Sequence, residues 1–261
     1  MSELGVSSTS SPQNRGRYAT VVGLLAAAQK PAARSAPAYS RYVNRRLGRY
    51  LAALAHLAGL GANAVTAVSA VWTFAGIALL VVFPPSWWLG VTVAACLLLG
   101  YAFDSADGQL SRLQGTSSPA GEWLDHMVDA VKMSTMPLAL AVGFYRFDVG
   151  PRAWLLVPLA SAVVSSVLFF GMILTEQLRR ANGSPSLAAA DPGRSWVRAV
   201  LVVPMDYGVL CLSFVLLGAP AVFMVVYSVI FAATALFLLL AAVKWFRELA
   251  GWPRHPGAEK G

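Results

Sequence analysis

The chain carries few charges for its length. Asp, Glu, Lys and Arg make up only 12% of its 261 residues, whereas 57% are hydrophobic. A soluble domain usually has about 25% charged residues. Such a shortage of charge argues against a soluble globular protein and favours one that lies within a membrane.

Cysteine is also scarce. The two that are present, Cys96 and Cys211, each stand within an apolar run, and no Cys-x-x-Cys or Cys/His cluster occurs. This argues against a disulfide framework and against a zinc site. We expect both thiols to be buried packing residues, as free cysteines commonly are.

Long apolar runs dominate the rest of the sequence. Six of them have about the 20 apolar residues that a helix needs to cross a membrane. They lie near residues 65–83, 86–106, 124–146, 153–176, 197–218 and 220–243, and the longer interruptions between them are 107–123, 147–152 and 177–196. We therefore predict an all-α integral membrane protein with six transmembrane helices.

The segment before the first span predicts a juxtamembrane amphipathic helix over residues 39–60. Arg41, Arg45 and Arg49 recur at every fourth position and share one helix face. Leucines at three- or four-residue spacing supply an apolar face: Leu47, Leu51, Leu54 and Leu57. A basic amphipathic helix of this kind lies on an anionic membrane surface. We expect residues 1–38 to be a flexible basic leader and residues 246–261 to be a cytoplasmic tail.

The placement of Lys and Arg predicts the orientation in the membrane. One side holds the N-terminal arm, Arg112, the Arg179–Arg180 pair and the C-terminal tail, whereas the other holds only Arg146 and Arg152. Basic loops stay in the cytoplasm. We therefore place both termini and the acidic segment described next on the cytoplasmic side of the inner membrane. The net charge of +8 then favours contact with lipid head groups rather than nucleic acid.

Acidic residues number only twelve, yet five of them fall within residues 104–129. Asp104 and Asp107 stand three apart at the end of the second predicted span. Asp125 and Asp129 stand four apart at the start of the third. Because residues at these spacings share a helix face, we expect two neighbouring helices to aim four carboxylates into one pocket.

Four carboxylates at a membrane edge repel one another unless cations hold them. Mg²⁺ and Mn²⁺ prefer such oxygen ligands and keep open positions for substrate phosphates. The side chains around the carboxylates fit a phosphate ligand: Gly108 and Gly121 permit close approach, Ser111 is small, and Arg112 can pair with a phosphate oxygen. The pattern predicts phosphoryl transfer, in which metals hold a pyrophosphate and a carboxylate takes a proton from an attacking hydroxyl.

The segment reads Asp-x-x-Asp-Gly-x-x-Ser-Arg, eight residues, then Gly-x-x-x-Asp-x-x-x-Asp. This pattern resembles the signature of the CDP-alcohol phosphotransferase family, which has alanine where this chain has Ser111. Asn63-Ala-Val-Thr66 resembles an Asn-x-x-Thr that family members carry near the start of the first span. The resemblance implies a six-helix transferase domain over residues 39–245, which acts as a homodimer on a CDP-linked alcohol and a hydroxyl acceptor.

The resemblance also implies roles at the matching positions. Two Mg²⁺ or Mn²⁺ ions would be surrounded by Asp104, Asp107, Asp125 and Asp129, and Asp129 would be the general base. The nucleotide would contact Gly108, Ser111, Arg112, Gly121, Asn63 and Thr66. The donor in such enzymes is often CDP-diacylglycerol, and CMP is released.

Two alternatives stay open. One is the same chemistry with a soluble CDP-polyol donor. The other is a cation transporter that uses intramembrane carboxylates. A transporter would usually place its carboxylates near mid-membrane, whereas here they cluster at one face.

Four further residues are candidates for binding the acceptor. Lys132 lies three residues after Asp129 on roughly the same face, and Arg194 and Arg198 lie near the start of the fifth predicted span. Together they could bind a phosphate on the acceptor, although the two arginines are equally typical of positive-inside anchors. Asp206 is either an acceptor contact or the partner of a buried base.

Overall fold

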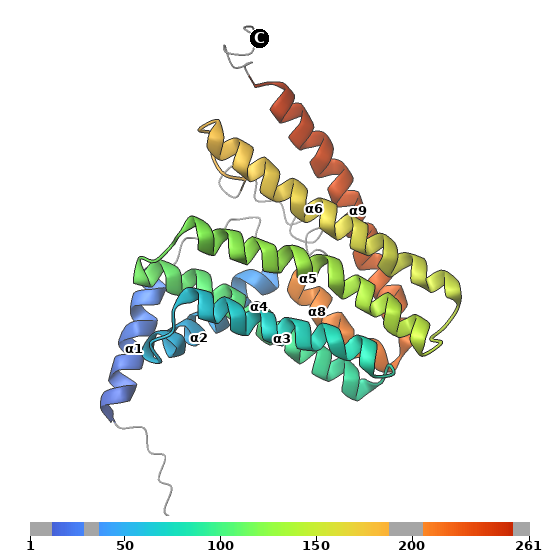
Figure 1. The fold of residues 1–261 in the computed structure, drawn as a ribbon, viewed down its shortest axis with the longest axis horizontal. Coiled ribbons are helices and arrows are strands. Elements are labelled where there is room, and N and C mark those ends of the chain that lie inside the picture. The colour runs from blue at the N-terminus through green and yellow to red at the C-terminus, as the bar shows by residue number, and fades with distance from the viewer. Residues whose placement is uncertain (1–11, 29–36, 188–205, 253–261) are drawn as a thin grey trace, which may run out of the picture.

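The structure is a computed structural model that describes residues 12–28, 37–187 and 206–252. Every regular element in this part of the chain is helical (Figure 1). The elements are α1 (Pro12–Ala27), η1 (Ser40–Asn44), α2 (Arg45–Leu57), α3 (Ala62–Val82), α4 (Trp87–Gln114), α5 (Pro119–Arg146), η2 (Arg152–Leu155), α6 (Leu156–Ala181), α8 (Tyr207–Ser213), η4 (Phe214–Gly218) and α9 (Pro220–Ala250). The prediction of an all-α protein is confirmed.

Five of the described helices are long and apolar enough to cross a membrane. They are α3, α4, α5, the Arg152–Ala181 stretch that joins η2 to α6, and α9. The shorter apolar stretch Tyr207–Gly218, made of α8 and η4, covers the second half of the predicted fifth span. The first half of that span lies outside the described residues, so the count of six spans stays a prediction.

The helices around the acidic segment are longer than hydropathy indicated. We expected an interruption over residues 107–123, but α4 continues to Gln114 and α5 begins at Pro119. The break between them is short because Gly115 ends α4 at a positive φ of 65°. The Ser118 side chain then caps α5 by accepting a hydrogen bond from the Gly121 amide at 3.1 Å. The whole acidic segment, apart from residues 115–118, is therefore helical.

Helix α3 packs against both α4 and α5, α6 packs against α5, and α9 packs against α6 (Figure 1). Small residues allow the closest of these approaches. A side chain on Gly143 of α5 would collide with the backbone oxygen of Leu80 on α3, and one on Gly100 of α4 would collide with Thr73. The Ser69 hydroxyl also donates a hydrogen bond to the Gly100 carbonyl at 2.8 Å. These contacts let α3 hold α4 and α5 in fixed positions.

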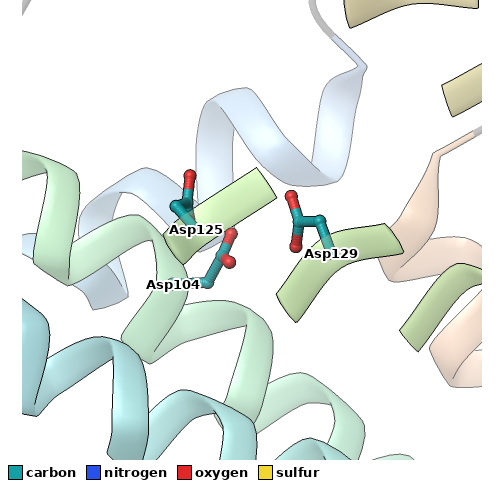
Figure 2. A group of neighbouring side chains, drawn as sticks. All are labelled: Asp104, Asp125 and Asp129. Carbon is teal, nitrogen blue, oxygen red and sulfur yellow. The ribbon is translucent and has the colours of Figure 1, made fainter. Parts of the chain in front are cut away.

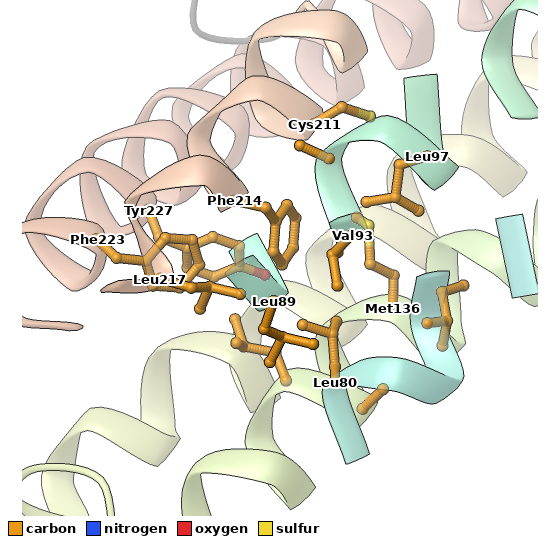
Figure 3. Packing of buried hydrophobic residues seen from close by; sticks show 14 of the residues in the cluster. Leu80, Leu89, Val93, Leu97, Met136, Cys211, Phe214, Leu217, Phe223 and Tyr227 are labelled. Carbon is orange, nitrogen blue, oxygen red and sulfur yellow. The ribbon is translucent and has the colours of Figure 1, made fainter. Parts of the chain in front are cut away.

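The main hydrophobic core joins these helices to the C-terminal part of the chain (Figure 3). Val93 and Leu97 of α4 meet Phe214 of η4 and Phe223 of α9, and all four are fully buried or nearly so. Cys211 of α8 lies in the same core, and Cys96 is also buried and free. The prediction that the cysteines are packing residues is confirmed.

Part of the segment over which we expected a flexible leader, residues 1–38, is helical. Within it, residues 12–27 form α1, and Val21 and Leu25 of this helix pack in a second cluster with Ala52 and Ala53 of α2. The small alanines of α2 provide the surface on which α1 rests, a feature that the Ser/Pro-rich composition did not reveal.

The predicted juxtamembrane helix is present as η1 followed by α2. Its alanine face packs toward α1 and α4, while Leu47, Leu54 and Leu57 are exposed. An exposed leucine face beside arginines is the arrangement expected of a helix that lies on a membrane surface.

Candidate active site

Three of the four predicted carboxylates come together. Asp104 of α4 and the pair Asp125 and Asp129 of α5 each offer an oxygen, and these oxygens all lie within 4.8 Å of one another. Figure 2 shows the three side chains approaching from the two helices. All three are partly buried, so a bound ion would be partly shielded from water.

The local sequence explains this geometry. Asp125 and Asp129 are one helical turn apart and therefore project from the same face of α5. Asp104 reaches them from α4, and α3 packs against both helices. Because α3 holds the two helices, the distance across which the carboxylates meet is set by packing rather than by a flexible loop.

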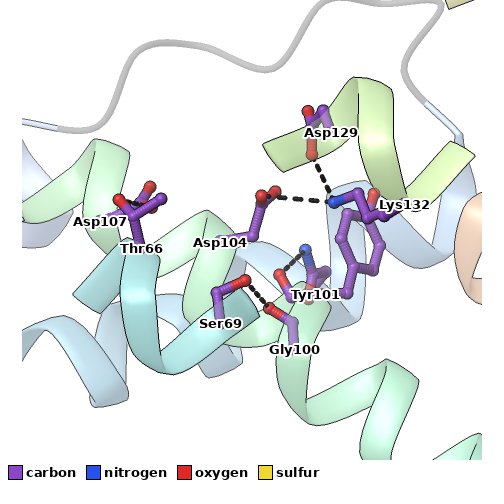
Figure 4. A network of polar contacts seen from close by, with 9 residues as sticks. Thr66, Ser69, Gly100, Tyr101, Asp104, Asp107, Asp129 and Lys132 are labelled. Carbon is purple, nitrogen blue, oxygen red and sulfur yellow. Dashed lines mark hydrogen bonds and ion pairs between the residues drawn. The ribbon is translucent and has the colours of Figure 1, made fainter. Parts of the chain in front are cut away.

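Asp107, the fourth predicted ligand, does not belong to this group. Its carboxylate accepts a hydrogen bond from the Thr66 hydroxyl of α3 at 2.6 Å, and it is only 6% exposed (Figure 4). Residues three apart on a helix are displaced by about 60° around its axis. This displacement turns Asp107 toward α3 while Asp104 faces α5, so in the described structure the four carboxylates do not form one group. The role of Asp107 as a metal ligand stays a prediction.

The Thr66–Asp107 bond brings together two sequence features that the family resemblance singled out. The other predicted nucleotide contacts lie nearby, around the same ends of α3, α4 and α5. A side chain on Gly121 would come within 3.4 Å of the Asn63 amide oxygen, and one on Gly108 would come within 3.5 Å of the Arg112 guanidinium. The predicted nucleotide residues therefore form a surface beside the carboxylate group.

Ser111, which stands where the resemblance expects alanine, is accommodated within α4. Its hydroxyl donates a hydrogen bond to the Gly108 carbonyl at 3.2 Å, one turn back along the helix. The extra oxygen is thus satisfied locally, within α4.

Lys132 occupies an unexpected place. Its ammonium lies 2.5 Å from an oxygen of Asp129 and 3.5 Å from an oxygen of Asp104, and the residue is 4% exposed (Figure 4). It also lies 5.4 Å from the centre of the Tyr207 ring of α8. Sequence spacing placed Lys132 on the face of α5 that carries Asp125 and Asp129, but we assigned it to the acceptor rather than to the carboxylates.

Asp206 has structural contacts. One of its oxygens accepts from the Gly208 amide at 3.0 Å and caps α8, and the other accepts from the Tyr39 amide at 2.6 Å. Both oxygens are therefore engaged by the backbone, which supports neither of the two roles that we considered for this residue. Arg194 and Arg198 lie outside the described residues.

The donor set fits a divalent cation. Three carboxylate oxygens at one place are the ligands that Mg²⁺ and Mn²⁺ select, and neither histidine nor cysteine belongs to the group. Lys132 shows that the group already attracts a cation, since a lysine is seldom so fully buried unless it is paired. One lysine offsets only one of three negative charges, so the site can still favour a divalent ion.

Comparison with known proteins agrees with the motif. A family model described as CDP-alcohol phosphatidyltransferase matches residues 60–253, which include every described helix from α3 to α9. A search of curated proteins found no match to the chain. Members of the matched family are membrane-bound transferases of substituted phosphate groups. The chain belongs to the CDP-alcohol phosphatidyltransferase family.

Proposed function

We propose that this transferase moves a phosphatidyl-type group from CDP-diacylglycerol to an acceptor alcohol, with release of CMP and with Mg²⁺ or Mn²⁺ at the carboxylates. The observation that carries the proposal is the meeting of Asp104, Asp125 and Asp129 within 4.8 Å across two helices. A divalent ion held there would neutralise the charge that develops on the pyrophosphate of the donor.

The chain's own residues would then act as follows. The acceptor hydroxyl oxygen attacks the β-phosphorus, the bond from that phosphorus to the oxygen bridging toward CMP breaks, and CMP departs. Asp129 accepts the hydroxyl proton, as a carboxylate within reach of the attacking oxygen can do. Arg112, which is exposed next to Gly108, would pair with a phosphate oxygen of the nucleotide.

We choose a lipid donor over a soluble CDP-polyol because a lipid held in the membrane would have direct access to carboxylates on membrane helices. The carboxylates lie on α4 and α5, two helices that are long and apolar enough to cross a membrane. The exposed leucines of α2 and the large apolar side chains on the outer faces of α6 and α9 suit contact with lipid. Family membership leaves no reason to retain the transporter alternative.

The remaining parts of the proposal concern the protein in its cell. We place it in the inner membrane as a homodimer with the carboxylates on the cytoplasmic side, acting in phospholipid synthesis. The excess of Lys and Arg on that side supports the orientation. A phosphate on the acceptor would be bound by Arg194 and Arg198 in this proposal, whereas Lys132 is taken up by the carboxylates.

A screen of CMP release tests the proposed substrates. Purified protein with Mg²⁺ is offered CDP-diacylglycerol or a soluble CDP-polyol, each with a set of phosphorylated and unphosphorylated alcohols. We expect CMP release with CDP-diacylglycerol to exceed that with the polyol donor by about 10²-fold or more, because the lost apolar contacts lower transition-state binding. Faster release from the soluble donor would overturn the choice of a lipid, and equal use of acceptors without phosphate would overturn the role of the two arginines.

A further inference from the structure

The ammonium of Lys132 is buried against carboxylates and is not exposed to a substrate. Its side chain is almost completely buried, and its ammonium pairs with Asp104 and Asp129, two of the three carboxylates of the proposed metal site. The ring of Tyr207 covers it from α8. A lysine removed from water needs such partners, because an isolated buried charge is strongly unfavourable.

The positions of these groups create a conflict with a metal ion. The oxygens that receive Lys132 belong to the same two carboxylates that would ligate the ion, so both cations draw on one set of negative charges. A divalent ion bound there would either displace the ammonium or stand close to it, and two cations so close repel each other. The third carboxylate, Asp125, has no ion pair with Lys132 in the described structure, so it is open to the first contact with an ion.

We infer that Lys132 is an internal cation that holds the carboxylates together when no metal is bound and competes with the divalent ion for Asp104 and Asp129. Lys132 is then a positioning residue that sets the metal affinity. The ion pairs of Lys132 with Asp104 and Asp129 stabilise the metal-free protein. They must weaken when a divalent ion takes the same carboxylates, so they lower the affinity for the metal. The inference rests on the proposed metal site and adds a determinant of its affinity.

The test measures metal binding and stability, not turnover. Full-length protein in detergent is titrated with Mn²⁺, with free Mn²⁺ followed by electron paramagnetic resonance, for the unmodified chain and for Lys132→Met. The methionine keeps an unbranched side chain of similar length and removes the charge. We expect its Kd for Mn²⁺ to fall by about tenfold or more.

Two controls isolate the charge at this position. Lys132→Arg keeps a cation between the carboxylates and should bind Mn²⁺ about as the unmodified protein does. Lys244→Met removes an exposed lysine on α9, away from the site, and should leave the Kd unchanged. An effect of equal size in Lys244→Met would show that net charge, and not the Lys132 contact, controls metal affinity, and would overturn the inference.

Thermal unfolding supplies the second readout. Without metal, Lys132→Met should unfold at a lower temperature than the unmodified protein, because three carboxylates have lost their cation. Saturating Mn²⁺ should restore most of the difference, since the ion replaces the missing charge. Lys132→Gln, whose amide can still donate to Asp129, serves as a second neutral variant. Competition between Lys132 and the metal ion is contradicted if a neutral variant stays unfolded in saturating Mn²⁺. It is also contradicted if a neutral variant folds but binds Mn²⁺ no more tightly than the unmodified protein.

The outcome separates this inference from the proposed function. If the unmodified protein binds no Mn²⁺, the metal site itself fails. If it binds Mn²⁺ and Lys132→Met binds it equally well, only the competition by Lys132 fails.

Discussion

Replacing Asp129 with asparagine is expected to lower CMP release by about 10⁴-fold. The amide has nearly the same size as the carboxylate, so the side chain should keep its place on α5. It cannot take the proton of the acceptor hydroxyl, and it removes one of the three negative charges that meet at the site. Release should be measured in a single turnover with donor and Mg²⁺ at saturation, so that weaker binding is not mistaken for slower chemistry.

Glu122→Gln provides the matched control for this variant. Glu122 stands on the same helix, two turns before Asp129, but its carboxylate pairs with Arg180 of α6 at 2.7 Å and is more exposed. We expect this change to alter CMP release by no more than about twofold, as surface ion pairs contribute little. An Asp129→Asn protein that keeps a tenth or more of the activity would remove Asp129 from the role of base.

Removal of divalent cations is expected to have a comparable effect. Treatment with EDTA should reduce CMP release by at least about 10³-fold, and added Mg²⁺ or Mn²⁺ should restore it. Without the ion, the partly buried carboxylates would face the pyrophosphate of the donor with like charges.

The Mg²⁺ concentration that restores CMP release after EDTA treatment tests which carboxylates bind the metal. Asp104→Asn and Asp125→Asn should each need more Mg²⁺ than the unmodified protein, because each variant loses a ligand. Glu122→Gln, on the same helix as Asp125, should recover at the usual concentration. CMP release that persists at full rate in EDTA would refute a metal-dependent mechanism.

The parts of the site that follow from helix geometry alone could be predicted from the sequence. Asp125 and Asp129 lie on one face of α5 because four residues make about one turn. That Asp104 reaches them depends on α3 packing against both α4 and α5, whereas the sequence indicated only that the two carboxylate pairs lie at the same face of the membrane. The carboxylate group, the membrane class and the family were therefore accessible before the structure.

Asp107 could not be placed in the same way. Two side chains three residues apart on a helix point in directions that differ by about 60°. Whether they face the same neighbouring helix or two different ones depends on how the neighbours pack. Helix α3 packs on the side of Asp107 and offers the Thr66 hydroxyl. The sequence contained both residues, but their contact depends on how α3 and α4 cross, which is a tertiary property.

Hydropathy also misplaced the ends of the helices. Residues 107–114 are too polar to extend a membrane span, yet they continue α4 up to Gly115. The apolar content of a segment indicates how deep it lies in a membrane, whereas caps and glycines decide where the helix ends. Gly115 and the Ser118-Pro119 pair were the available signals for these ends.

The partner of Lys132 was hidden for a related reason. A lysine one turn from a carboxylate can point to solvent, to a substrate or to that carboxylate, and sequence spacing does not distinguish these cases. In this structure the lysine points to the carboxylates because it is buried beneath Tyr207 of α8. Helix α8 is far from Lys132 in the sequence, so sequence spacing could not reveal this contact.

The most direct test of the account is to locate Mn²⁺ in the protein by its anomalous scattering in a crystal. We predict an ion within about 2.5 Å of a carboxylate oxygen from each of Asp104, Asp125 and Asp129. Mn²⁺ bound only at other residues, or these three carboxylates turned away from a common ion at saturating Mn²⁺, would contradict it.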